Sequence, residues 1–213
     1  MIVNFREAVS GITHLFAACL SIVGMIWLII ISHHQLDKLF IVAFYGITMT
    51  LLFLASARLH LSHGSPEYML KLRRQDHASI YLVMAGTYTP MIYLLLTGVW
   101  RWGMLLIIWM FCSIGMYWKL KRLNGRSHIS TIMYLCGGWF AIISAPQWVP
   151  RLPGGTIVLI VAGGIVYSIG ALVFALEKPN LASHFGFHEL WHLFVIAGSI
   201  LHFFAMLQIV RLF

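Results

Sequence analysis

Residues 187–210 read FHELWHLFVIAGSILHFFAMLQIV, a largely apolar run that begins with two histidines four residues apart. About 20 apolar residues are enough to cross a bilayer as a helix, so this segment predicts a membrane span. In a helix, His188 and His192 lie on one face about one turn apart, which suits two ligands of one metal ion. Ionisable side chains are costly inside a membrane, and the pair therefore indicates a functional site.

The composition extends this pattern to the whole chain. Of the 213 residues, 61% are hydrophobic and 9% are charged, and the mean hydropathy is +0.89. In soluble domains, roughly a quarter of the residues are charged. The sequence therefore predicts an all-α, polytopic membrane protein. Since no hydrophilic stretch is long enough to fold separately, we expect residues 1–213 to form a single domain. The three cysteines lie in different apolar segments, which predicts no disulfide framework.

Apolar segments of sufficient length recur along the chain. We expect a seven-transmembrane-helix bundle with spans at about 12–32, 38–61, 77–97, 101–119, 129–146, 155–176 and 187–210. Pro90 falls inside the third span and is expected to kink that helix.

Basic residues predict the orientation of these spans. Ten of the fourteen Lys and Arg residues fall on the side of the N-terminus, and four fall on the other side. The positive-inside rule then places the N-terminus in the cytoplasm and the C-terminus outside. The net charge of +8 comes from Lys and Arg residues in short loops between the spans, where they set the orientation of the helices. We therefore expect no nucleic-acid partner. The cytoplasmic loops can bind anionic lipid headgroups through Arg73, Arg74, Lys119, Lys121 and Arg122.

The predicted topology places several polar residues at similar depth on one membrane face. Ser56 and His60 end the second span, Asp76 precedes the third, and His188 and His192 begin the seventh. Three imidazoles with an open position for water describe a catalytic zinc site, and a nearby carboxylate can deprotonate that water. His60, His188 and His192 are therefore candidate metal ligands, with Asp76 and Ser56 as candidate catalytic residues. Spacing does not say whether the three helices are neighbours.

The same residues carry a resemblance to a known family. Its motifs are Ser56-x-x-x-His60, Arg74-Gln75-Asp76-His77, the run from Ala85 to Pro90, His188-x-x-x-His192, and an N-terminal pattern with Glu7 and Thr13-His14. In this order over seven spans, they resemble the hemolysin III family. That family belongs with the progestin and adipoQ receptors and, more distantly, the alkaline ceramidases. The resemblance implies a zinc ion held by His60, His188 and His192 near the cytoplasmic side, with Asp76 contacting the zinc-bound water.

Several residues near these motifs keep alternative interpretations. The string His-Glu-x-x-His also matches a zinc-protease motif with Glu189 as general base, but we expect Glu189 to be a polar residue at a helix N-terminus, where negative charge is stabilised. Glu7 and His14 either brace the site or line its entrance, or have a capping or structural role. His184 shares a face with His188 and His192, yet we expect it in the preceding loop. His202 lies roughly 15 Å deeper at helical rise and is expected to form an interhelical hydrogen bond.

The sequence-based hypothesis is a zinc-binding integral protein of the bacterial plasma (inner) membrane. Its leading activity is hydrolysis of a lipid amide or ester bond near the cytoplasmic face, with membrane lipids as substrates. In this hypothesis Asp76 takes a proton from the water, and Ser56 positions the water or stabilises the oxyanion. The alternatives are a non-enzymatic structural-zinc sensor of membrane state and a pore-forming hemolysin. A continuous polar stripe, which a channel requires, is absent from the spans. The sequence does not indicate an oligomeric state.

Overall fold

The computed structural model describes residues 7–121, 128–182 and 185–213. The helical elements are α1 (Ala8–Ser32), α2 (Leu36–Leu61), α3 (Pro66–Leu95), α4 (Gly98–Lys121), α5 (His128–Gly138), η1 (Phe140–Ser144), α6 (Ala145–Trp148), η2 (Val149–Arg151), α7 (Gly154–Leu176) and α8 (Phe187–Leu212). Within these described ranges, seven segments are long and apolar enough to cross a membrane. This confirms the all-α, seven-span architecture. Apart from one isolated bridge, the described ranges contain no β-structure.

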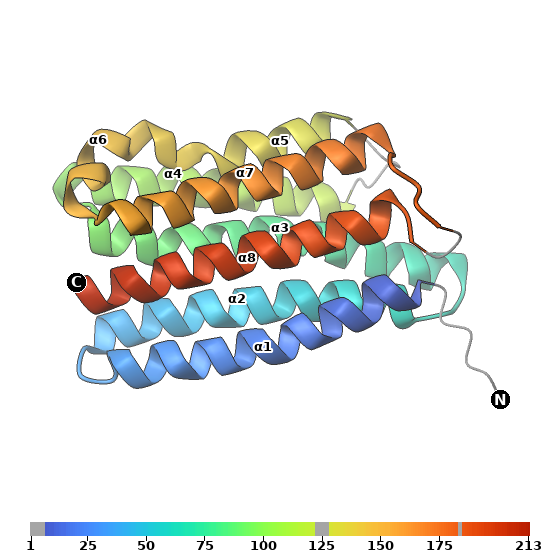
Figure 1. Cartoon of the computed structure of the whole chain (residues 1–213), viewed down its shortest axis with the longest axis horizontal. Helices are drawn as coiled ribbons and strands as arrows, with labels where there is room; N and C mark the ends of the chain where they lie inside the picture. Colours follow the sequence, from blue (N-terminus) through green and yellow to red (C-terminus); the bar gives the residue numbers. More distant parts are fainter. Residues whose placement is uncertain (1–6, 122–127, 183–184) are drawn as a thin grey trace.

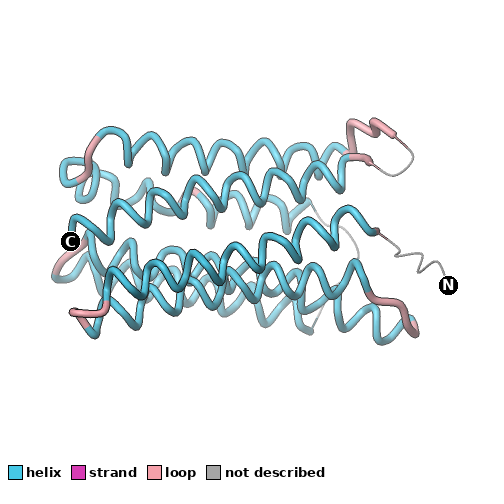
Figure 2. The backbone as a smooth tube through the Cα atoms, turned by 60° about the horizontal axis from the view of Figure 1, so that its bottom comes forward, coloured by secondary structure: helices cyan, strands magenta, loops and turns pink. Residues whose placement is uncertain are grey.

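The spans form a bundle in which consecutive helices pack side by side. α1 contacts α2, α2 contacts α3, α3 contacts α4, and α7 contacts α8. α8 also packs against α1, so the last span lies beside the first. Figure 1 shows the two termini at opposite ends of the bundle, and Figure 2 shows the connecting loops gathered at those ends. The start of α1, the end of α2, the start of α3 and the start of α8 therefore share one end.

α3 begins earlier than the predicted third span. It starts at Pro66, whereas the apolar pattern placed the span at 77–97. The Ser65 side chain accepts a hydrogen bond from the backbone N–H of Tyr68 at 3.2 Å, and Pro66 occupies the first turn. Both features stabilise a helix start, so the helix extends through a polar segment that hydropathy alone leaves outside the membrane.

The predicted span at 129–146 is not a continuous α-helix in the structure. α5 ends at Gly138, and the chain continues through η1, α6 and η2 to Arg151. The Tyr88 hydroxyl bridges the break, because it donates to the Gly138 carbonyl at 2.6 Å and accepts from the Ala141 N–H at 3.2 Å. A side chain of α3 thus satisfies backbone groups that the interrupted helix leaves free, as a membrane interior requires.

Two basic side chains hold helix ends together at the end of the bundle that carries the C-terminus. The buried Lys38 ammonium at the start of α2 donates to the Val210 carbonyl near the end of α8 at 3.0 Å. Arg151 donates to the Leu95 carbonyl at the end of α3 at 2.7 Å. Cations suit the free carbonyls of helix C-termini. The Lys38 bond also fixes α2 and α8 relative to each other along the bundle axis.

Polar contacts also join α7 and α8 within the membrane. His202 lies 3.2 Å from the Ile160 carbonyl, which confirms the expected interhelical hydrogen bond. Tyr167 contacts the Ser199 hydroxyl at 2.7 Å, and its ring packs against that of His202. Gly163 permits this approach, because a Cβ at that position would lie 2.2 Å from a ring carbon of His202.

We predict that Gly163→Ala lowers the stability of the bundle. The added methyl group overlaps the hydrogen-bonded His202 ring, and overpacking of this kind costs about 1–3 kcal/mol. Thermal unfolding in detergent micelles measures the effect. Gly103→Ala in α4 is the control, because a Cβ there meets no atom within 4 Å. Equal melting temperatures for the two variants would contradict the tight α7–α8 contact.

Candidate metal centre

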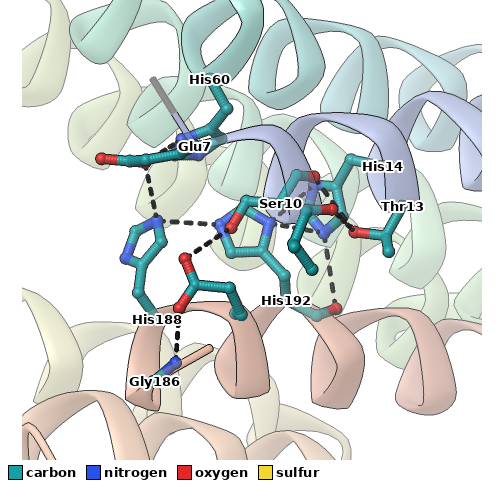
Figure 3. Close-up of polar contacts among 10 residues, drawn as sticks. Glu7, Ser10, Thr13, His14, His60, Gly186, His188 and His192 are labelled. Atoms are coloured by element: carbon teal, nitrogen blue, oxygen red, sulfur yellow. Dashed lines mark hydrogen bonds and ion pairs between the residues drawn. The ribbon is translucent and has the colours of Figure 1, made fainter. Parts of the chain in front are cut away.

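The end of α2 and the start of α8 bring three histidines together. His60 lies in the last turn of α2, and His188 and His192 lie in the first turns of α8. One ligand nitrogen from each residue lies within 4.8 Å of the others. The ring of His60 is centred 4.7 Å from that of His192 and 5.0 Å from that of His188. Figure 3 shows the three side chains converging from the two helices.

The spacing of these nitrogens fits a shared ion. The Nε2 atoms of His188 and His192 are 3.2 Å apart. Imidazole nitrogens bound to one tetrahedral zinc at about 2.0–2.1 Å lie roughly 3.3 Å from each other. His60 and His192 are buried, and a histidine binds a metal ion through a neutral imidazole nitrogen. The three histidines can therefore hold a metal ion.

His14 contacts the ring nitrogen of His192 that does not face His188. The buried His14 ring is centred 4.0 Å from the His192 ring, and its Nε2 lies 2.9 Å from His192 Nδ1. The other nitrogen of His192, Nε2, faces His188. Metal-binding histidines usually engage the ring nitrogen that does not bind the metal in a hydrogen bond, which fixes the tautomer and the ring orientation. His14 has this position relative to His192.

Glu7 has the corresponding position relative to His60. Its Oε2 pairs with His60 Nδ1 and also lies 3.5 Å from His188 Nε2. Because Glu7 immediately precedes α1, this carboxylate connects the first helix to both α2 and α8. The sequence had left Glu7 and His14 between a site role and a structural one. The structure places both residues against the three histidines, as Figure 3 shows.

Ser56 and Asp76 lie next to this cluster. Ser56 is one helical turn before His60 and is buried, and its Oγ has no hydrogen-bond partner within the described part of the chain. The partly buried Asp76 carboxyl on α3 lies beside Ser56 and within electrostatic range of His60. A buried hydroxyl without a partner is costly unless another molecule satisfies it. The Ser56 hydroxyl and the Asp76 carboxyl are thus close enough to interact with each other next to His60.

The structure assigns Glu189 a capping contact. Its Oε2 accepts a hydrogen bond from the Gly186 backbone N–H at 2.8 Å, and its Oε1 lies 3.4 Å from the Ser10 hydroxyl. These contacts satisfy the N-terminus of α8, where negative charge is stabilised. They favour the capping interpretation over that of a protease base. His184, the other residue considered near the pair, lies outside the described residues.

Seven membrane-spanning helices with a three-histidine cluster at one end define this chain as an integral membrane protein that can hold a metal ion. The family model described as haemolysin-III related matches residues 3–203. The chain is 38% identical to Hemolysin-3 of Bacillus cereus over 95% of its own length and 90% of that protein. It is 34% identical to the Hemolysin-3 homolog of Bacillus subtilis (strain 168) over 95% and 93% of the two chains. The chain belongs to the haemolysin III family.

We predict that replacing His60, His188 and His192 together by Ala removes bound transition metal from the purified protein. Single replacements are expected to weaken binding strongly, because each removes one of three coordinating nitrogens. Elemental analysis after purification measures the metal content. Glu189→Gln serves as the control, since its contacts cap α8 and leave the three ring nitrogens in place. Unchanged metal in the triple variant would show that the ion binds elsewhere.

We further predict that His14→Phe lowers metal affinity by about 10–100-fold, the usual effect of losing an outer partner of a metal-bound histidine. Phenylalanine keeps a ring in the buried space but removes the contact to His192 Nδ1. Competition with a chelator measures the affinity. Thr13→Val is the matched control, because the Thr13 hydroxyl bonds only to carbonyls of α1. Wild-type affinity in His14→Phe would show that His14 serves only in packing.

Proposed function

We propose that the three-histidine cluster binds zinc. Imidazole ligands suit zinc, copper, iron and nickel, and a set of three with an open fourth position is typical of catalytic zinc. The observation that carries the proposal is the convergence of His60, His188 and His192 with their outer partners Glu7 and His14. His60 and His192 each have such an outer partner, as the histidine ligands of a zinc site usually do.

We propose that the zinc site hydrolyses an amide or ester bond of a membrane lipid. When bound, zinc polarises a carbonyl and lowers the pKa of a coordinated water to ~7. Asp76 accepts a proton from the attacking water and returns it to the leaving nitrogen or oxygen as the acyl bond breaks. The Ser56 hydroxyl donates a hydrogen bond to the water or to the carbonyl oxygen as negative charge develops there.

Access to the site supports a substrate that arrives from the membrane. The side chains of His188 and Glu7 are 27% and 33% exposed, whereas His60 and His192 are buried. The cluster is therefore open at the edge formed by the start of α8 and the start of α1. The surrounding helix faces are apolar, with Ile12, Leu15 and Phe16 among the exposed side chains of α1. An acyl chain can contact these faces while the polar bond reaches the histidines.

We also propose the orientation and location of the protein. The excess of Lys and Arg on the side of the N-terminus supports an N-terminus in the cytoplasm, since basic loops are retained there. The bacterial relatives support a plasma (inner) membrane location. The metal cluster then lies at the cytoplasmic face, because the ends of α2 and α8 that carry it share a side with the N-terminus (Figure 1).

A second function, a zinc-dependent sensor without turnover, is favoured by one feature of the site. Glu7 and His14 belong to the α1 region, while the histidines that they contact belong to α2 and α8. Binding of an ion would therefore hold three helices in one arrangement. A membrane state that shifted these helices would in turn change the zinc affinity, because binding and conformation are reciprocally linked.

We predict that Asp76→Asn retains zinc but lowers lipid hydrolysis by about 10²–10⁴-fold, the usual contribution of a general base. Ser56→Ala is expected to lower turnover by about 10²–10³-fold. Release of fatty acid from ceramide-like amides and acyl esters in mixed micelles measures activity, with elemental analysis on the same samples. Glu189→Gln should keep both zinc and turnover. A zinc-loaded wild type that hydrolyses none of these lipids would contradict the hydrolase and favour the sensor.

A further inference from the structure

A separate cavity lies between the first turns of α3 and the end of α4. Its volume is about 430 Å³, and its lining residues are Glu67, Leu70, Lys71, Arg74, Gln75 and Leu120. The five residues from α3 follow the spacing of one helical face. α3 is 30 residues long, so its first turns extend past the ends of α7 and α8, as Figure 1 shows. The cavity therefore lies at the level where a helix leaves the hydrocarbon region.

The charges in this cavity favour an anion. Lys71 and Arg74 face one carboxylate, that of Glu67, and neither cation forms an ion pair within the described ranges. Arg74 is half-buried, and its Nε is buried without a hydrogen-bond partner. A guanidinium binds phosphate oxygens through several N–H groups at once, and a lysine adds a point charge. A phosphate in the cavity would satisfy the donors that the protein leaves unpaired.

Apolar side chains form another part of the same cavity. Leu70 is 37% exposed and Leu120 is 42% exposed, and both line the cavity together with the basic residues. A free phosphate does not need such a surface, whereas a phospholipid has an anionic headgroup next to apolar chains. The combination of two unpaired cations with exposed leucines at headgroup level selects a lipid over a soluble anion.

We propose that this cavity binds the headgroup of an anionic phospholipid, with the phosphate on Lys71 and Arg74 and the acyl region along Leu70 and Leu120. The site is distinct from the histidine cluster and does not depend on zinc. The site contains fewer basic residues than the set that the sequence predicted to bind anionic headgroups. Lys119 does not belong to it, because its ammonium is buried and donates to the Ser130 hydroxyl at 2.5 Å. Arg122 lies outside the described residues.

Lipid binding to the full-length protein in neutral detergent tests this proposal. Phosphatidylglycerol and phosphatidylcholine are titrated separately, and native mass spectrometry counts the bound molecules. Wild type should bind phosphatidylglycerol more tightly. Arg74→Gln should weaken that binding about fivefold, and the double change with Lys71→Gln about 25-fold, since each change removes one direct contact to the phosphate, which contributes about this factor. Glu67→Gln should strengthen binding, because it removes the opposing charge.

Arg73→Gln is the matched control. Arg73 is exposed, adjacent in sequence and absent from the cavity lining, so the affinity of Arg73→Gln for phosphatidylglycerol should stay within about twofold of wild type. An equal loss in Arg73→Gln and Arg74→Gln would overturn the proposal in favour of general surface charge. Equal binding of the two lipids would also overturn it. Displacement of the lipid by glycerol 3-phosphate at the lipid's own concentration would assign the cavity to a soluble anion instead.

Discussion

Within the bilayer, each polar group must find its partner inside the protein, and this constraint shapes the molecule. Backbone groups satisfy it by forming helices, which is why seven helical membrane spans account for most of the described residues. Where a helix is interrupted, a side chain takes over, as Tyr88 does at the break after Gly138. The same constraint acts on ionisable side chains, so imidazoles and carboxylates gather in contact with one another rather than facing lipid.

The histidine cluster depends on the relative height of α2 and α8. His60 belongs to one helix and His192 to the other, so a shift of one turn, about 5.4 Å, would separate their nitrogens. At the opposite end, the Lys38 ammonium binds the Val210 carbonyl and fixes the same pair of helices. α1 then adds Glu7 and His14 from a third direction. The cluster is thus held by contacts at both ends of the bundle.

The sequence predicted the spans well because hydropathy reports directly on the membrane solvent. It also placed His60, His188 and His192 at one depth, since alternating spans return every second helix end to the same face. It did not predict the early start of α3, which depends on the Ser65 cap, or the broken fifth span, which depends on a side chain of another helix. Sequence spacing did not predict lateral contacts such as that of His14 with His192, because such contacts depend on which helices are neighbours.

α3 connects the candidate metal centre with the cavity that we propose for lipid binding. Arg74 lines the cavity beside α4, while Asp76, two residues later, lies beside Ser56 and His60. Because two residues of an α-helix differ by about 200° in direction, one helix presents these side chains to opposite surroundings. A headgroup bound at Arg74 would therefore fix the depth of α3 in the membrane. Because Arg74 and Asp76 belong to the same helix, fixing the depth of Arg74 also fixes the depth of Asp76 relative to the histidines.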